Sequence, residues 1–370
     1  MNRLLTFTSK HFLKLCFAFW VFGISQSIAV AIRDNSLDNF LSWRLTQYYV
    51  NYFDFGFVKR GLLGTLLYPI FHTIGGNKPL AVAMIILLDF AIVFGGLALI
   101  KIAFDRESRF GTTLKDVIKC LIVFSPVGIM QLSYDAGRFD HVNMILVMAS
   151  LVLMLKGHNV LAGVLLGLGV LVHEAVFVFG LPVLLAIGVA TNKHKPIFNI
   201  AGALLKPAVI PSVCAISVAI LGNSDVSFAA ALPPGFDRGS MVWQRGLLEP
   251  ATNLSLIQYA VLAFYALTPC VFLTHFYRSN ALRLDLVFFA TLSTFALFAL
   301  GTDYARWCQL ILFSNLIVVV FHSMSGKSDL KITSRMLNFL FILYALPLGP
   351  IGVDSVLPYV DVFSRRVLGF

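Results

Sequence analysis

The sequence predicts an all-α polytopic membrane protein, and three observations support that prediction. Of the 370 residues, 58% are hydrophobic and only 12% are charged, and the mean hydropathy is +0.86. A soluble domain carries about 25% charged residues. Several apolar runs reach the ~20 residues that a helix needs to cross the hydrocarbon core. A β-barrel would show short alternating segments instead, so we expect one helical transmembrane domain over residues 1–370.

The apolar runs predict about ten or eleven spans. The first ends at Ala29-Val30-Ala31, which is similar to a signal-peptide cleavage site, but its apolar run is longer than a usual signal core, so we expect an uncleaved helix. Two runs are short and predict a hairpin of half-helices whose tip is at 172–174. The expected spans are 13–32, 80–103, 117–133, 141–156, 159–172, 175–191, 197–221, 254–277, 284–301, 308–324 and 336–352.

The distribution of Lys and Arg predicts the orientation of these spans. With the N-terminus in the cytoplasm, the cytoplasmic segments hold 16 basic and five acidic residues, whereas the external segments hold 11 basic and 12 acidic residues. This bias follows the positive-inside rule. We therefore expect a multi-pass protein of the bacterial inner membrane.

Two external loops are long, at about 33–79 and 222–253. The first contains an aromatic-rich stretch at 43–57, which predicts a helix that lies in the plane of the membrane interface. The other external segments are tight turns. No separate soluble domain is expected.

Composition and motifs exclude several classes of function. The formal net charge of +10 fits contact with anionic membrane lipids, and no polar segment interleaves bases with aromatics, so no nucleic-acid partner is expected. The five cysteines lie in or beside apolar runs without short spacing, which predicts neither a metal site nor disulfides. No nucleotide-binding or hydrolase motif is present, and no cofactor is expected. Asp89 lies inside a span, where we expect it to pair with Lys206 or to stay protonated.

Ionisable residues gather in the short external turns. The turn at 134–143 holds Asp135, Arg138, Asp140 and His141 in seven residues, and a helix N-cap at Asp140 would explain one carboxylate but not the arginine. His173 and Glu174 lie between apolar half-helices, where ionisable groups are usually paired or functional, although a plain external turn is the alternative.

Two further groups have simple structural explanations. An ion pair at helical spacing would explain Asp303 and Arg306. Asp54, Lys59 and Arg60 in the first loop fit plain interfacial charges.

The predicted topology places these residues on one external face. Arginine forks bind phosphate, and a carboxylate beside a leaving phosphate is suited to act as a general base. The set predicts a site for a phosphate or pyrophosphate and comprises Asp54, Lys59, Arg60, Asp135, Arg138, Asp140, His141, His173, Glu174, Arg245, Asp303 and Arg306.

Residues 137–190 resemble the GT-C family of polytopic glycosyltransferases, which use polyprenyl- or dolichyl-phosphate sugars. Gly137-Arg138-Phe139-Asp140 opens a span that exits at Lys156-Gly157-His158. It is followed by the half-helix from Leu161 to Val170, the polar pair His173-Glu174 and Leu181-Pro182-Val183-Leu184-Leu185. The match covers about 55 residues.

The resemblance implies that a polyprenyl-phosphate sugar is the donor and that a glycan, lipid or protein at the external face is the acceptor. It also implies a catalytic acidic residue in the first external loop and inversion at the anomeric carbon. We expect Asp54 to be this base because Lys59 and Arg60 are close to it, with Asp38 second and Asp34 third. None of the three lies in the Asp-Glu dipeptide that many members carry.

Within this hypothesis, Arg60, Arg138 and Arg306 hold the donor phosphate. Asp140, His173 and Glu174 line the pocket, and the carboxylates of Asp54, Asp140 and Glu174 open into one external cavity.

Two other functions stay open on the sequence. A polymerase or ligase for polyprenyl-pyrophosphate glycans would use similar external residues. A membrane transporter would place charges at the bilayer midplane, where only Asp89 and Lys206 qualify.

The topology gives a first testable prediction. Reporter fusions at Arg109, Lys195, Arg278 and Lys331 should report the cytoplasm, and fusions at Asp237 and Asp361 the exterior. An external reporter at Lys195 would contradict the half-helix hairpin, because it would move His173 and Glu174 to the cytoplasmic side.

Overall fold

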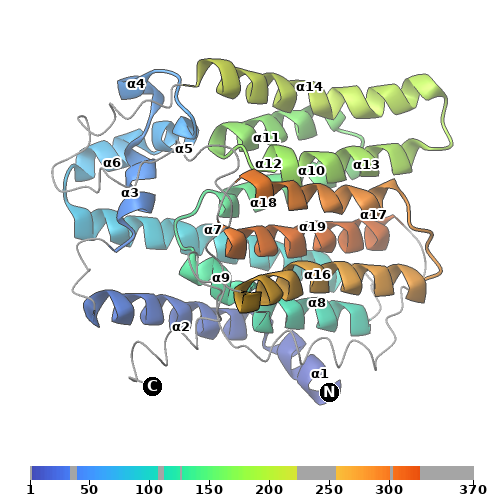
Figure 1. The fold of residues 1–370 in the computed structure, drawn as a ribbon, viewed down its shortest axis with the longest axis horizontal. Coiled ribbons are helices and arrows are strands. Elements are labelled where there is room, and N and C mark those ends of the chain that lie inside the picture. The colour runs from blue at the N-terminus through green and yellow to red at the C-terminus, as the bar shows by residue number, and fades with distance from the viewer. Residues whose placement is uncertain are drawn as a thin grey trace. The chain divides into compact units, whose positions relative to one another are not determined.

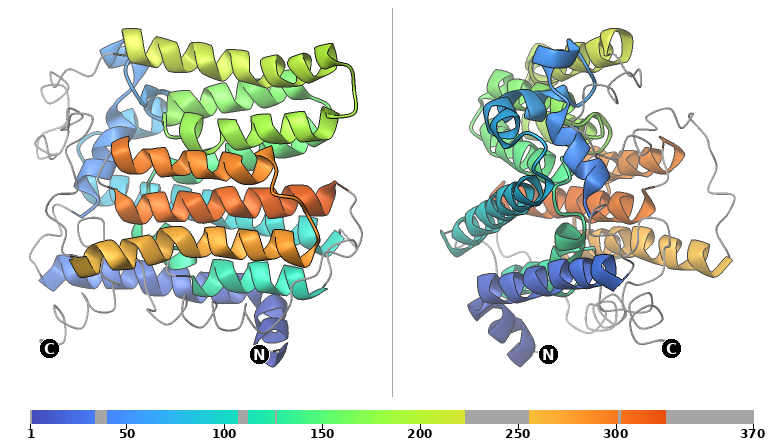
Figure 2. Two further views of the ribbon diagram at one scale, coloured as in Figure 1. Left: turned by 45° about the vertical axis from the view of Figure 1, so that its right-hand side comes forward. Right: turned by 90° about the vertical axis from the view of Figure 1, so that its left-hand side faces the viewer.

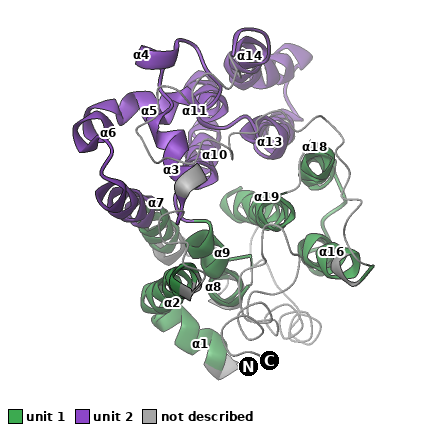
Figure 3. Cartoon of the chain, turned by 60° about the vertical axis from the view of Figure 1, so that its left-hand side comes forward, with its two compact units in different colours: residues 1–33, 93–135, 247–370 green, residues 34–92, 136–246 purple. Residues whose placement is uncertain are grey.

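The computed structural model describes residues 2–33, 40–106, 112–125, 127–222, 256–300 and 303–325, and every element in these ranges is helical, as predicted (Figure 1). The chain divides into two compact units (Figure 3). Unit 1 comprises residues 1–33, 93–135 and 247–370, and unit 2 comprises residues 34–92 and 136–246. The single membrane domain expected from the sequence stays a prediction.

The helices follow the apolar runs of the sequence closely. In chain order they are α1 (Asn2–Lys10), α2 (Phe12–Arg33), α3 (Ser42–Tyr49), α4 (Tyr52–Phe55), α5 (Gly61–Leu66), α6 (Tyr68–Ile74), α7 (Lys78–Arg106), α8 (Thr112–Phe124), α9 (Ile129–Tyr134), α10 (Asp140–Leu155), α11 (Asn159–Val172), α12 (Val176–Phe179), α13 (Leu181–Asn192), α14 (Ile197–Leu221), α16 (Leu256–Ser279), α17 (Leu286–Ala290), the 3₁₀ helix η2 (Thr291–Ala296), α18 (Leu297–Leu300) and α19 (Tyr304–Met324).

Six segments of the described chain are long and apolar enough to cross a membrane, and four apolar helices are shorter. The six are Phe12–Ala29, Lys78–Ile102, Lys115–Tyr134, Ile197–Leu221, Tyr259–Ser279 and Tyr304–Met324. The shorter ones are Asp140–Leu155, Asn159–Val172, Val176–Asn192 and Leu286–Ala299, so the predicted half-helices exist. The expected span 336–352 and the loop 222–253, beyond its first residue, lie outside the described residues.

In unit 2, α10, α11, α13 and α14 run alongside one another (Figures 1 and 2). Gly163 and Gly167 of α11 lie directly against α14, because a Cβ on Gly163 would meet the backbone of Lys206 and Pro207 and one on Gly167 would meet Ile210. Small residues four apart let membrane helices approach closely. The other face of α14 exposes apolar side chains such as Val209, Val213 and Ile216, as expected for a surface that faces lipid.

The first part of the aromatic stretch, α3, is buried within unit 2, whereas Phe53 of α4 is 69% exposed. In α3, Arg44, Leu45, Thr46, Gln47 and Tyr48 are all at most 8% exposed. The side chains of Leu45 and Tyr48 join a hydrophobic cluster with residues of α6, α7 and the start of α10. α3 therefore lacks the exposed faces that a helix in the plane of the interface turns to lipid and to water, and its orientation in the membrane stays a prediction.

Unit 1 contains paired helices with their own polar contacts. α16 packs beside α19, and α2 packs beside α8 and α9. The hydroxyl of Tyr277 donates to Asp285 Oδ1 at 3.2 Å and lies 2.8 Å from His322 Nε2, which ties α16 to α19. These bonds satisfy polar groups that would otherwise be costly inside a helical membrane protein.

Gly137 shapes the turn that leads into α10. Its φ of 82° is a left-handed conformation, and a Cβ there would press on Ile85 of α7 beside Tyr48 and Arg44. Only glycine meets both conditions without strain.

We therefore expect Gly137→Ala to lower the free energy of unfolding by about 2 kcal/mol or more, from the backbone conformation and the overpacking together. Thermal unfolding of the purified protein measures this. Gly95→Ala is the matched control, because a Cβ at Gly95 meets no atom within 4 Å and alanine favours the helix. Equal melting temperatures for the two variants would contradict the packing at Gly137.

Candidate functional site

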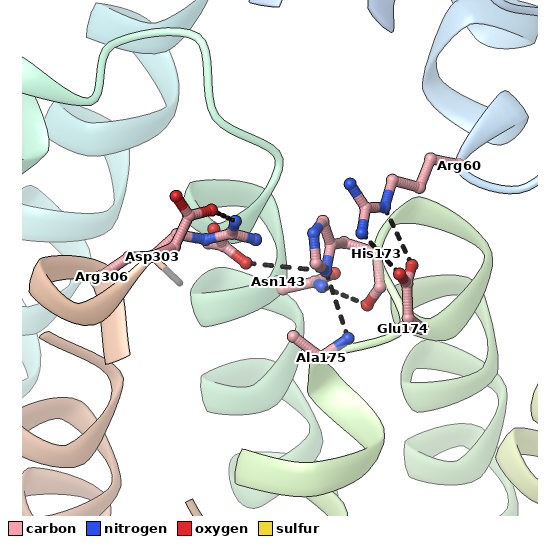
Figure 4. A network of polar contacts seen from close by, with 8 residues as sticks. Arg60, Asn143, His173, Glu174, Ala175, Asp303 and Arg306 are labelled. Carbon is pink, nitrogen blue, oxygen red and sulfur yellow. Dashed lines mark hydrogen bonds and ion pairs between the residues drawn. The ribbon is translucent and has the colours of Figure 1, made fainter. Parts of the chain in front are cut away.

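A bidentate ion pair joins the first loop to the tip of the half-helix hairpin in unit 2. Nε and Nη2 of Arg60 contact Oε2 and Oε1 of Glu174 at 2.9 and 2.5 Å (Figure 4). Arg60 directly precedes α5, and Glu174 lies in the turn between α11 and α12. Bidentate contacts of this kind are both strong and directional.

The backbone of Arg60 is held in an uncommon conformation. Its φ is 59°, in the left-handed region, although the residue is not glycine. Such a conformation costs of order 1–3 kcal/mol and concentrates at functional sites. Here it aims the guanidinium at Glu174 while Gly61 starts α5 against Tyr52 and Val58.

His173 is fixed from two sides at the same tip. Its backbone is extended after the end of α11, and its carbonyl oxygen accepts a hydrogen bond from Nδ2 of Asn143 at 2.9 Å. Its Nδ1 accepts from the backbone N–H of Ala175 at 3.1 Å (Figure 4). Both His173 and Asn143 are buried, so this part of the tip is not a turn in simple contact with water.

Asp140 approaches the tip from α10. It is 1% exposed, and its Oδ1 lies 3.9 Å from His173 Nδ1. α10 begins at Asp140 itself, with Phe139 in the N-cap position, so N-capping does not describe the role of Asp140. Asp140 and Asn143 are three residues apart and therefore share the helix face toward His173. We call Arg60, Asp140, Asn143, His173 and Glu174 the polar cluster.

The ion pair sets the charge state of Glu174. Burial alone would raise the pKa of its carboxyl, but the charge and hydrogen bonds of Arg60 hold that pKa well below its usual range. The side chain is still 42% exposed, so the cluster is open at Glu174. Arg60 itself is 20% exposed at its side chain.

A second buried pair lies on the neighbouring helices of unit 2. Nδ1 of His141 is 2.6 Å from Oδ1 of Asp89, and both side chains are at most 2% exposed. The expected partner of Asp89, Lys206, is exposed on α14 instead, so that pairing is wrong. His141 follows Asp140 directly, which places this pair on α10 next to the polar cluster.

Asp54 occupies a different place from the polar cluster. Asp54 lines a cavity of about 120 Å³ whose lining residues fall between Tyr48 and Gly75 and include neither Asp140 nor Glu174. The expected common cavity for the three carboxylates is not what the structure shows. Lys59 lies beside Gly222, just after α14.

The other predicted site residues divide by unit. Arg138 is 5% exposed in unit 2. In unit 1, Asp135 accepts a hydrogen bond from Gln131 at 2.7 Å, and Arg306 pairs with Asp303 at 2.7 Å, as the helical spacing predicts (Figure 4). Asp34, Asp38 and Arg245 lie outside the described residues.

Asn143 was not among the predicted site residues, although its spacing from Asp140 signalled a shared face. Among the described residues, no group of three His, Cys, Asp or Glu side chains is placed to hold a metal ion. The polar cluster thus offers an arginine fork, two carboxylates and an imidazole, which suits binding of an oxyanion and transfer of a proton.

The chain belongs to the family described as uncharacterised membrane protein Rv1490, whose model matches residues 16–235. That match includes every residue of the polar cluster. No curated protein and no solved structure matches the chain. The family and the six long apolar helices make this an integral membrane protein with several spans.

The lowered pKa of Glu174 predicts how the ion pair responds to pH. A carboxylate with a depressed pKa stabilises the folded state above the unfolded-state value, about 4.3, and loses that contribution as the pH falls toward the folded-state pKa. A double-mutant cycle with Arg60→Gln and Glu174→Gln should give a coupling of roughly 0.2–1 kcal/mol, constant from pH 5 to 8 and smaller below about pH 4. Thermal unfolding of the four proteins measures it. A coupling that already vanishes between pH 7 and pH 5 would contradict the depressed pKa.

Proposed function

We propose that this protein is a membrane glycosyltransferase that moves a sugar from a polyprenyl-phosphate donor to a glycan, lipid or protein acceptor. The proposal rests on one observation: the guanidinium of Arg60 makes a bidentate contact with the carboxylate of Glu174, beside Asp140 and His173. We further propose that this end of unit 2 faces the exterior of a bacterial inner membrane, in agreement with the positive-inside bias.

The arginine supplies the phosphate contact. A carboxylate and a phosphate offer the same pair of oxygens to a guanidinium, so the fork that holds Glu174 also fits a phosphodiester. Donor binding then exchanges one anion for the other at Arg60. Arg138, two residues before Asp140, is a candidate for a second phosphate contact.

That exchange makes Glu174 the general base of the proposal, in place of Asp54. Once Arg60 turns to the phosphate, the interaction that depresses the pKa of Glu174 is gone, and its carboxylate becomes a stronger base. Asp54 is less suitable, because its cavity is lined by other residues.

The reaction is a single displacement at the anomeric carbon. Glu174 takes the proton of the acceptor hydroxyl while that oxygen bonds to the carbon. The bond from the carbon to the phosphate oxygen breaks, and its electron pair leaves with the polyprenyl phosphate, whose charge Arg60 stabilises. Asp140 and Asn143 act as positioning residues through His173. Such a displacement inverts the configuration at the carbon.

A membrane transporter is the second candidate, because Asp89 and His141 form a buried ionisable pair on α7 and α10. Ionisable groups within apolar helices are typical of ion and proton pathways. The two functions differ in what Asp89→Asn does. In a transferase, Asp89→Asn should leave sugar transfer at the polar cluster intact. In a proton-coupled transporter, the same substitution should uncouple transport from proton movement.

Glu174→Gln should lower transfer by about 10²–10⁴-fold, the usual contribution of a general base. Arg60→Lys should raise the KM for the donor, since a point charge replaces a fork. The assay is incorporation of label from polyprenyl-phosphate hexoses and pentoses by membranes that contain the protein.

Lys195→Gln is the matched control, because it removes one exposed positive charge at the turn between α13 and α14. It should leave incorporation unchanged. The transferase proposal fails if the wild type uses none of these donors, or if Glu174→Gln retains full activity while folding normally.

A further inference from the structure

The cavity at Asp54 is a second candidate site in unit 2. It measures about 120 Å³, and its lining includes Tyr48, Tyr49, Asn51, Asp54, Tyr68 and His72. Pockets for drug-sized ligands span about 300–1,000 Å³, so this cavity fits one small ring. Among the described residues, its lining shares no member with the polar cluster.

The carboxylate of Asp54 is held in place by its neighbour. Nδ2 of Asn51 donates to Asp54 Oδ2 at 2.9 Å, and the backbone N–H of Asp54 donates to Asn51 Oδ1 at 2.9 Å. This reciprocal pair ties down one carboxylate oxygen. The side chain stays exposed, and no described residue donates to Oδ1, so that oxygen can accept from a ligand.

The aromatic side chains around the cavity are also fixed. His72 stacks on Tyr68 with ring centroids 4.9 Å apart and planes at 23°. The hydroxyl of Tyr49 donates to the carbonyl of Gly75 at 2.6 Å, and Phe71 packs against both Tyr48 and Tyr49. These contacts leave a half-buried Tyr68 and an exposed His72 in the lining of the cavity.

We propose that this cavity binds one neutral sugar ring. A pyranose presents hydroxyls in its plane and an apolar C–H face, so it needs a carboxylate or amide beside an aromatic ring. The carboxylate of Asp54 and the ring of Tyr68 supply this combination, while the amide of Asn51 is already used to hold Asp54 and to donate to the carbonyl of Tyr49. The other chemistry that carboxylates and aromatics serve is an alkylammonium, which needs several ring faces turned toward the cation. Here the rings of Tyr48 and Tyr49 pack against Phe71 and do not form such a cage around a cation, so the lining favours a sugar.

The sugar site does not depend on the transfer reaction. It lies apart from Arg60 and Glu174, and binding requires no donor phosphate. If the protein is a transferase, the site would hold a ring of the acceptor glycan. If it is not, the cavity still binds a sugar.

The test uses the full-length protein in lipid nanodiscs, because maltoside detergents are themselves sugars. The probes are the methyl pyranosides of glucose, galactose and mannose, and saturation-transfer NMR reports which ring protons touch the protein. We expect at least one pyranoside to bind. Asp54→Asn should weaken it roughly tenfold or more, since a charged acceptor bonds more strongly than an amide. Tyr68→Leu should remove the contact with the C–H face.

Two variants serve as controls. Asp116→Asn removes a carboxylate from α8 and should bind as the wild type does. Glu174→Gln should bind the sugar normally even if it loses transfer, so the two proposals can fail separately. Thermal unfolding confirms that each variant folds.

Three outcomes overturn the sugar site. The first is no saturation of any pyranoside by the wild type. The second is unchanged binding in folded Asp54→Asn and Tyr68→Leu proteins. The third is binding of choline in place of the sugars with loss in Asp54→Asn, which would make this an ammonium site.

Discussion

A charge removed from water needs a partner, and this requirement organises unit 2. Arg60 and Glu174, 114 positions apart in the sequence, satisfy each other, and their contact connects the first loop to the tip of the half-helix hairpin. Asp89 and His141 meet the same need on α7 and α10. Removing one member of the Asp89–His141 pair, whose side chains are at most 2% exposed, would leave a buried polar group without its partner, which costs more than the pair itself contributes. The positions of α5, α10 and α11 therefore depend on where these charges meet.

Small residues make the charge pairs possible by bringing helices close. Gly64 of α5 lies against the carbonyl of Val50, where a side chain would collide. Gly137 lets the chain turn tightly into α10, and Gly169 faces Asn143 and Val176. Each is a place where backbone approaches another element near the polar cluster. The absence of a side chain at these glycines therefore lets the elements that carry the cluster pack closely.

The sequence could predict what depends on local pattern. Length and hydropathy identified the helices and the half-helix hairpin, and the three-residue spacing identified the pair of Asp303 and Arg306. Contacts between segments that are far apart in the sequence could not be predicted from it. Arg60 and Glu174 were both expected at the external site, but no local pattern indicated that they pair with each other. One of the two expectations for Asp89, a pair with Lys206, rested only on the position of both residues in apolar runs. The burial of α3 was missed for the same reason, since aromatic residues suit an interface and a core equally.

The brevity of α11 has a consequence for the bilayer around it. Its 14 residues rise about 21 Å, well short of a hydrocarbon core of about 30 Å. A helix of this length that began at one interface would end several ångströms beneath the other, and His173 and Glu174 would lie at that depth. Lipid adapts to such a mismatch by thinning locally. Headgroups around unit 2 would then dip toward Arg60, so a lipid-borne phosphate would meet the guanidinium by moving sideways within its own leaflet.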